Sequence, residues 1–202
     1  MIDKISNKIL NFISTENIDN DKKEVLLFGI TRIVEDIPKT IGIILIGIIL
    51  GILKEIAIVT IVLATYKTFV GGVHAKTNLG CFIYSVIFYL AIIYSARYIN
   101  LSGINQHGIY LLIYIFSVYT IVVYVPADVI EIPKINLNLR RSLKIKAFIV
   151  LNIIYVIALV FISNNIIKNL LIYSVFYIGV MTTRTIYKLF KTQYGFEAYI
   201  PE

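Results

Sequence analysis

Cysteine is the scarcest reactive residue of this chain, because Cys81 is the only one among 202 residues. A lone cysteine excludes an internal disulfide and any metal site built from several cysteines. The chain has only two histidines, His74 and His107, which is too few for a credible zinc site. It also lacks a glycine-rich phosphate-binding loop. We therefore expect no metal and no other cofactor.

Charged residues make up only 15% of the chain and tryptophan is absent, whereas 58% of the residues are hydrophobic. The mean hydropathy is +0.84, which excludes an ordinary soluble domain. The apolar residues form several near-continuous runs, and runs of about 20 residues are long enough to cross a hydrocarbon core of about 30 Å. This composition predicts an all-α fold, in which residues 1–202 form one polytopic integral membrane helical bundle.

Acidic residues are also few, 12 against 19 lysines and arginines, and the formal net charge is +7. Such an excess can indicate a nucleic-acid-binding protein. Here the basic residues lie mainly in segments that flank apolar runs, which is the pattern produced by membrane orientation. We therefore expect a multi-pass protein of the cell membrane, with the lipid bilayer as a partner and no nucleic acid.

The order of polar and apolar segments predicts an N-terminal arm followed by about six transmembrane helices. The arm, residues 1–36, begins with apolar positions at helical spacing and reads as an amphipathic or interfacial segment. The stretch 37–70 fits either one long tilted helix or a hairpin that turns at Lys54-Glu55. The predicted spans lie near 37–53, 56–70, 81–99, 108–125, 145–162 and 166–181.

Charge favours the hairpin. The loop 126–146 carries five basic residues and is expected to be cytoplasmic. Two spans separate this loop from the segment 67–80, which must then face the cytoplasm too. The lysine-containing N-terminal arm is expected on the same side. Only a hairpin between the arm and residue 67 satisfies both placements.

The segment KTFVGGVHAKTNLGC, residues 67–81, brings a possible nucleophile and a possible base close together in sequence. Cys81 follows His74 by seven residues. An unbroken helix would hold the two about 10 Å apart along its axis, too far for a hydrogen bond. The segment must therefore bend or unwind if they are to meet. The residues that permit such a break are Gly71, Gly72, Asn78 and Gly80.

Cys81 is predicted to lie in the first turn of the next helix, because Gly80 ends the loop where an apolar run begins. At that position the free amide groups and the helix dipole favour thiolate over thiol. A nearby imidazole could then remove the proton and later return it. A cysteine in an apolar chain is, however, usually a small core hydrophobe, and a histidine at a membrane boundary is often only an interfacial group. Spacing alone leaves both interpretations open.

The run GGVHAKTNLGC, residues 71–81, resembles the signature of the accessory gene regulator protein B family. These are membrane endopeptidases that process quorum-sensing peptide precursors in Gram-positive bacteria. The resemblance implies that His74 and Cys81 are the catalytic pair, and Gly72 matches the glycine two residues before the histidine. The likeness extends to the chain length, the polar arm, the order of the apolar segments and the loop VPADVIEIPK. The family often carries arginine seven residues before the histidine, whereas this chain has Lys67. Lysine keeps the positive charge but lacks the planar guanidinium donor.

The resemblance also implies a function. The substrate would be a pro-peptide with an amphipathic N-terminal helix and an acidic C-terminal tail. The chain would be a thiol protease that cleaves off this tail through a thioester acyl-enzyme and promotes cyclisation to a thiolactone or lactone autoinducer. The catalytic residues would lie at the cytoplasmic side of the membrane, and the enzyme would be a homodimer.

Several further residues have two possible roles. Asp128 could be a third member of a Cys-His-Asp set or could cap its own loop. Lys67, Lys76 and the basic residues between 134 and 146 could attract an acidic peptide tail, or could only reflect membrane orientation. The alternative function is a non-enzymatic small transporter or scaffold, in which Gly71 and Gly72 would serve helix packing. Against it, no charge lies deep inside a clearly spanning segment.

Overall fold

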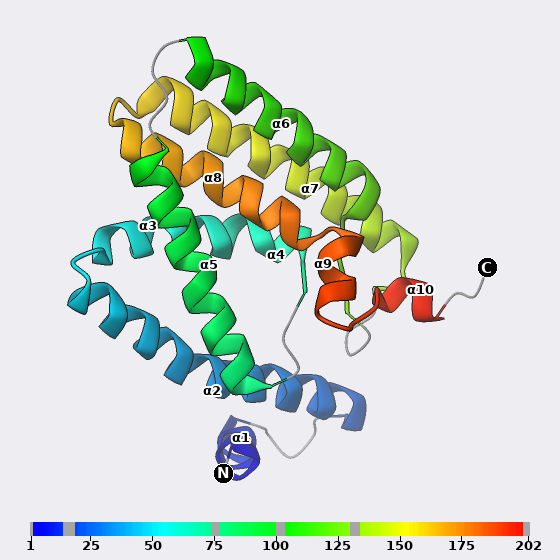
Figure 1. The fold of residues 1–202 in the computed structure, drawn as a ribbon. Helices are drawn as coiled ribbons and strands as arrows, with labels where there is room; N and C mark the ends of the chain where they lie inside the picture. The colour runs from blue at the N-terminus through cyan, green and yellow to red at the C-terminus, as the bar shows by residue number, and fades with distance from the viewer. Residues whose placement is uncertain (1, 14–18, 74–76, 100–103, 130–133, 200–202) are drawn as a thin grey trace. The chain divides into compact units, whose positions relative to one another are not determined.

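The structure is a computed structural model that describes residues 2–13, 19–73, 77–99, 104–129 and 134–199 (Figure 1). The described residues form helices and one isolated parallel bridge but no strand, which confirms the predicted all-α class. The elements are α1 (Ile2–Ile13), α2 (Asn20–Ile49), α3 (Leu53–Val62), the π-helical turn η1 (Leu63–Lys67), α4 (Thr68–Val70), α5 (Asn78–Tyr98), α6 (Ile104–Tyr124), α7 (Leu137–Val156), the π-helical turn η2 (Ile157–Phe161), α8 (Asn165–Met181), α9 (Arg184–Leu189) and α10 (Gly195–Tyr199).

The chain divides into two compact units, residues 1–53 and 54–202. In the first unit, α1 packs against α2. α2 runs without interruption through Pro38, so the expected interfacial segment and the first apolar run form one helix. Proline inside a helix leaves the carbonyl four residues earlier without its backbone donor. The chain turns after α2 at Gly51, whose φ of +65° suits glycine.

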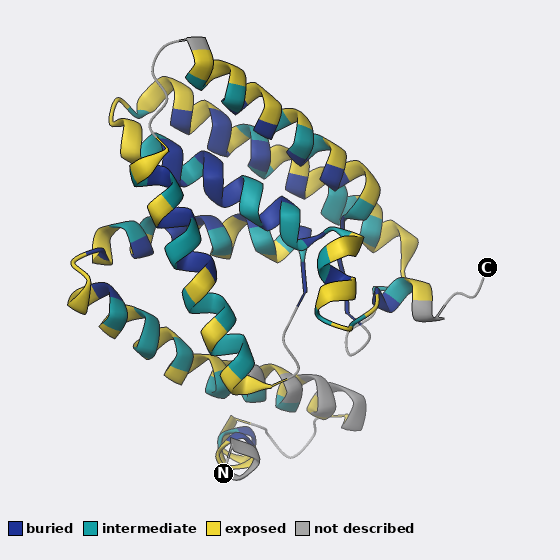
Figure 2. Cartoon of the chain, in the orientation of Figure 1, coloured by how far each residue is buried: buried dark blue, intermediate teal, exposed yellow. Residues whose placement is uncertain are grey.

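The second unit is organised around α8, which contacts α5, α6, α7 and η1. Buried residues follow α8 along much of its length (Figure 2). Gly179 lets α6 approach closely, because an ideal Cβ there would lie 3.2 Å from both Phe116 and Thr120. Small residues at such crossings are typical of helix pairs in membranes, where close van der Waals packing replaces the hydrophobic effect.

Within the described part of the chain, three helices are long and apolar enough to cross a membrane, residues 78–98, 105–124 and 137–161. The outward faces of these helices are rich in exposed aliphatic side chains, such as Leu112 and Val122 on α6. α8 is apolar but has only 17 residues. These features support a membrane protein, and the count of six spans stays a prediction.

Polar contacts at the end of α5 far from Cys81 join several helices of the second unit. Arg97, in the last turn of α5, forms an ion pair with Glu55 at the start of α3. The buried Asn169 of α8 accepts a hydrogen bond from the Tyr110 hydroxyl at 2.5 Å and donates one to the Ala96 carbonyl at 3.1 Å. Such pairing is needed where water cannot solvate polar groups. These contacts align the helices at one end of α5, and the candidate site lies at the other end.

Candidate active site

The helix break that the sequence predicts is present. α4 ends at Val70 and α5 begins at Asn78. Between them, Gly71 and Gly72 have φ angles of +82° and +134°, which side-chain-bearing residues rarely adopt. One turn earlier, Lys67 ends the π-helical turn η1, and its carbonyl accepts the Gly71 N–H at 2.8 Å. π-helical turns of this kind are frequent at functional sites.

The residues Gly71–Val73 form an extended segment, here called the glycine strap. The Gly72 N–H donates to the Ala127 carbonyl and the Ala127 N–H donates to the Val70 carbonyl, both at 2.9 Å. The Val73 N–H donates to the Met181 carbonyl at 3.4 Å. These bonds attach the glycine strap to the loop after α6 and to the C-terminal end of α8.

Cys81 lies in the first turn of α5, as predicted. The Thr77 side chain accepts the Gly80 N–H at 3.0 Å, and the Cys81 N–H donates to the Thr77 carbonyl at 2.8 Å. The loop therefore ends at Thr77 and not at Gly80, because a threonine at the N-cap starts the helix before the glycine. Asn78, expected in the loop, opens the helix instead. Cys81 is a half-buried free thiol.

One turn after Cys81, a second link reaches Met181. The Tyr84 hydroxyl donates to the Met181 sulfur, and the Tyr84 ring meets Phe190 edge-on at 5.0 Å. The Met181 carbonyl also holds Val73. Val73 of the glycine strap and Tyr84 of α5 thus both contact Met181, at the C-terminal end of α8. His74 and Lys76 lie within that segment, outside the described residues, so their roles stay predictions.

A buried cluster formed by Val73, Ala127, Val129, Tyr187 and Tyr194 supports the glycine strap. The rings of Tyr187 and Tyr194 stack at 4.1 Å. The Tyr187 hydroxyl donates to the Asp128 carbonyl at 3.0 Å, and the Tyr194 hydroxyl donates to the Thr182 carbonyl. Burial raises the pKa of both tyrosines, so they remain neutral donors. Sequence reasoning missed this pair, because the chain has 15 tyrosines and no pattern marks these two.

Asp128 closes the loop that follows α6. Its buried carboxylate accepts the Lys134 backbone N–H at 2.7 Å and pairs with Arg140 at 3.3 Å. The other carboxylate oxygen is buried without a hydrogen-bond partner among the described residues. Burial lowers the pKa of Lys134, and the charge of Asp128 opposes that shift. These contacts are those of a loop-capping residue, and a catalytic role for Asp128 stays a prediction.

The structure brings together Gly71, Gly72, Lys67 and the loop of Asp128, and places Cys81 at the start of the helix anchored beside them through Tyr84. Among the described residues, no three histidine, cysteine, aspartate or glutamate side chains come together as a metal site would require. The chemistry available among the described residues is that of a free thiol in the first turn of a helix.

Comparison with known proteins gives one consistent answer. Residues 6–186 match the family described as accessory gene regulator B. The chain is 24% identical over 132 residues to AgrB-like protein 2 of Clostridium perfringens (strain 13 / Type A), covering 63% of this chain and 62% of that protein. It is 29% identical over 145 residues to AgrB-like protein 1 of the same strain, covering 72% and 75%.

The match to the first of these relatives spans less than two thirds of that relative's length. No solved structure matches the chain. The family match, by contrast, covers most of the sequence and includes the glycine strap, Cys81 and Asp128. This chain therefore belongs to the accessory gene regulator B family.

Proposed function

We propose that this protein is a membrane cysteine endopeptidase that removes the acidic tail of a quorum-sensing pro-peptide, with Cys81 as nucleophile and His74 as base. Family membership supports a role in the processing of such peptides. The observation that carries the proposal is the position of Cys81 in the first turn of α5, a helix that Tyr84 links to Met181, the residue that also holds Val73.

The proposed first half-reaction is that of a cysteine protease. The Cys81 thiolate attacks a backbone carbonyl of the pro-peptide, and a C–S bond forms as the peptide C–N bond breaks. His74 holds the thiol proton as imidazolium and gives it to the departing amine of the acidic tail. The product is a thioester between Cys81 and the remaining peptide.

The second half-reaction regenerates the enzyme. A thiol or hydroxyl of the bound peptide attacks the thioester, its proton passes to Cys81, and the ring closes as a thiolactone or lactone. Exchange of one thioester for another is nearly neutral in bond energy. The thiolactone route therefore needs no energy-supplying cofactor. Water at the same step would give a linear acid instead.

We also propose that the site faces the cytoplasm and that the enzyme is a homodimer. The orientation is supported by the basic residues at the start of α7, such as Arg140 and Arg141. A cysteine introduced at Asn164, in a Cys81→Ala background, should react with an impermeant thiol reagent added to whole cells. A cysteine at Asn138 should not react, and the reverse pattern would invert the orientation.

The experiment that tests the activity uses the full chain in nanodiscs and the pro-peptide. We expect the pro-peptide to be encoded by a small open reading frame beside this gene. Wild type should release the tail and form a thioester that hydroxylamine removes. Cys81→Ala should insert normally and cleave nothing, and Cys81→Ser should retain little activity. Substantial cleavage by purified Cys81→Ala protein would exclude the proposed nucleophile and favour a transporter or scaffold.

A further inference from the structure

A cavity of about 360 Å³ opens between α9, α10 and the adjoining ends of α6 and α7. Its apolar lining includes Tyr124, Tyr194 and Phe196. Its charged lining consists of Arg140, Arg184 and Glu197. The cavity therefore combines two guanidinium groups with aromatic walls, and one carboxylate of the chain itself already lies in it.

Arg140 is held firmly in this cavity. Its side chain is only 17% exposed and pairs with Asp128. It also donates hydrogen bonds to the carbonyls of Lys134 and Pro126, at 3.2 and 3.4 Å. The guanidinium carbon lies 4.1 Å from the centre of the Phe196 ring, a cation–π contact. Arg140 is thus a fixed part of the cavity wall, and Asp128 balances its charge.

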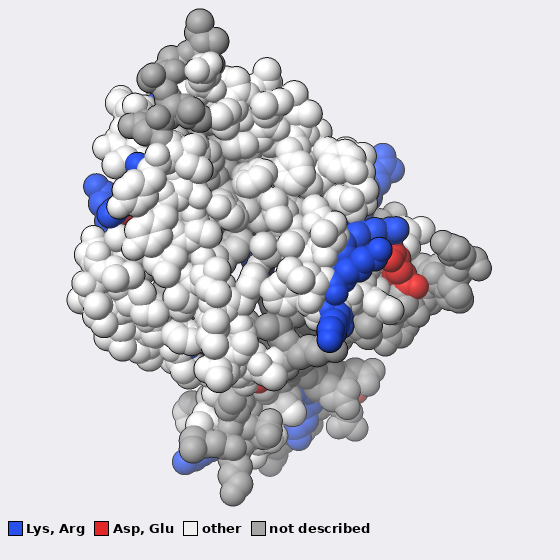
Figure 3. Space-filling model, viewed as in Figure 1, with Lys and Arg blue, Asp and Glu red and all other residues white. Residues whose placement is uncertain are grey.

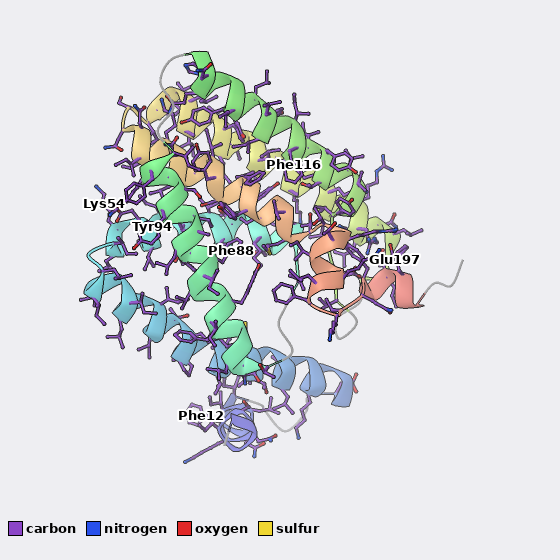
Figure 4. The ribbon with its side chains drawn as sticks, in the orientation of Figure 1. Phe12, Lys54, Phe88, Tyr94, Phe116 and Glu197 are labelled. Atoms are coloured by element: carbon purple, nitrogen blue, oxygen red, sulfur yellow. The ribbon has the colours of Figure 1, made fainter. Side chains whose placement is uncertain are left out.

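Arg184 differs from Arg140 because its partner is exposed and exchangeable. Its guanidinium pairs with Glu197 at 2.5 Å, and the two side chains are 65% and 53% exposed. Exposed ion pairs are weak and salt-sensitive, so a competing carboxylate can replace one member. Glu197 comes from the short helix α10 (Figure 4).

The surface around this pair is positively charged. Lys and Arg side chains gather over α9, with acidic atoms directly beside them (Figure 3). The exposed cations on and after α9 include Lys188 and Lys191. Such a surface raises the local concentration of an anionic peptide.

The cavity shares its walls with the framework of the candidate active site. Tyr194 stacks on Tyr187, which holds the Asp128 carbonyl, and both tyrosines belong to the cluster beneath Val73. A peptide carboxylate bound beside Arg184 would therefore be positioned relative to the glycine strap by direct packing.

We propose that Glu197 is an internal placeholder, which occupies with Arg184 the position that receives a carboxylate side chain of the substrate's acidic tail. This inference rests on the proposed function for its substrate class. An entering tail exchanges with Glu197, whose exposed side chain then turns away from Arg184. The Arg184–Glu197 ion pair therefore disfavours peptides whose negative charge is too small to displace Glu197.

The test measures binding and not cleavage. The full chain in phosphatidylcholine nanodiscs is titrated with a fluorescein-labelled hexaglutamate peptide, with hexaglutamine as the uncharged control. Glu197→Gln should tighten hexaglutamate binding by about two- to fivefold, the range expected for loss of one exposed ion pair. Arg184→Gln should weaken hexaglutamate binding. When it is combined with Glu197→Gln, the tighter binding caused by Glu197→Gln should disappear. Arg184→Lys in the same combination should retain most of that gain.

Lys188→Gln is the matched control, because it removes one exposed cation from the same helix without altering the cavity lining. It should leave the effect of Glu197→Gln unchanged. Equal weakening by Arg184→Gln and Lys188→Gln would mean diffuse attraction and would overturn the proposal. An unchanged affinity of Glu197→Gln for hexaglutamate would also overturn the proposal.

A second arm addresses lipid. Hexaglutamate that fails to bind, together with Arg184-dependent binding of phosphatidylglycerol, would assign the cavity to a lipid headgroup and overturn the proposal. Repeating the titration in Cys81→Ala should give the same affinities. A protein that binds hexaglutamate through Arg184 but never cleaves the pro-peptide would contradict the peptidase, and leave the carboxylate site standing.

Discussion

Gly71 lies so close to Ala127 that an ideal Cβ on the glycine would be 2.3 Å from the Ala127 carbonyl oxygen. That separation is far below van der Waals contact, and the atom it meets is backbone, which cannot rotate away. The positive φ of Gly71 adds a second reason for glycine. This contact joins the segment before His74 to the loop that contains Asp128.

Gly71→Ala should therefore destabilise the second unit by about 2–4 kcal/mol, from the collision and the backbone strain together. Gly72→Ala should cost less, about 1–2 kcal/mol, because its φ is also positive but a Cβ would lie 3.6 Å from Met181. Thermal unfolding in detergent and cleavage of the pro-peptide measure both effects.

Gly108→Ala is the control for this pair. A Cβ at Gly108, in α6, meets nothing within 4 Å, so alanine should be neutral or stabilising there. If Gly71→Ala behaved like Gly108→Ala, the close approach to Ala127 would be wrong.

Asp128→Ala should destabilise the loop after α6 by about 3 kcal/mol, because it leaves the largely buried Arg140 without its ionic partner. Asp128→Asn keeps an acceptor for the Lys134 N–H and should cost less. Cleavage by folded Asp128→Asn should stay within about tenfold of wild type, since the described contacts are structural. A larger loss in kcat, with unchanged unfolding temperature, would instead indicate a catalytic carboxylate. Asp36→Asn, which changes an exposed carboxylate, is the control.

His74→Ala should reduce cleavage by about 10²-fold or more, the usual scale for a positioned acid–base group. It should also slow alkylation of Cys81, because no imidazole would remain to take up the thiol proton. The measurement is alkylation rate against pH in nanodiscs. His107→Ala, which changes an exposed histidine in the first turns of α6, should alter neither rate. Wild-type cleavage by His74→Ala would exclude the dyad.

Alkaline pH should destabilise the cluster beneath the glycine strap. Burial raises the pKa of Tyr187 and Tyr194 above the value of about 10 for an unfolded tyrosine. Above that pH the unfolded chain releases these protons while the folded chain retains them. Stability is therefore fully present below about pH 10 and falls as pH rises further.

Tyr187→Phe should lower stability near neutral pH by about 1 kcal/mol, because it removes the hydrogen bond to the Asp128 carbonyl. It should also make the alkaline decline shallower, since one titrating group is gone. Unfolding temperature measured from about pH 8 to pH 11 tests both effects. Parallel alkaline slopes for wild type and Tyr187→Phe would contradict the assignment.

Residues close in sequence determined much of what could be predicted. Long apolar runs indicate membrane helices, because a bilayer demands continuous apolar length and internal backbone hydrogen bonds. Gly71 and Gly72 indicated the helix break, since glycine adopts backbone angles that other residues avoid. The helix that carries Cys81 begins at Asn78, three residues before the apolar run, because Thr77 caps it.

Only the tertiary structure decided which distant residues meet. Gly71 pairs with Ala127, Val73 with Met181 and Arg184 with Glu197, and the first two pairs are separated by more than fifty residues. Local sequence propensity cannot predict such pairings, since they depend on which helix faces come together around α8. The choice of Tyr187 and Tyr194 among 15 tyrosines is of the same kind. Their role arises from burial against the glycine strap, and burial is a property of the packed bundle.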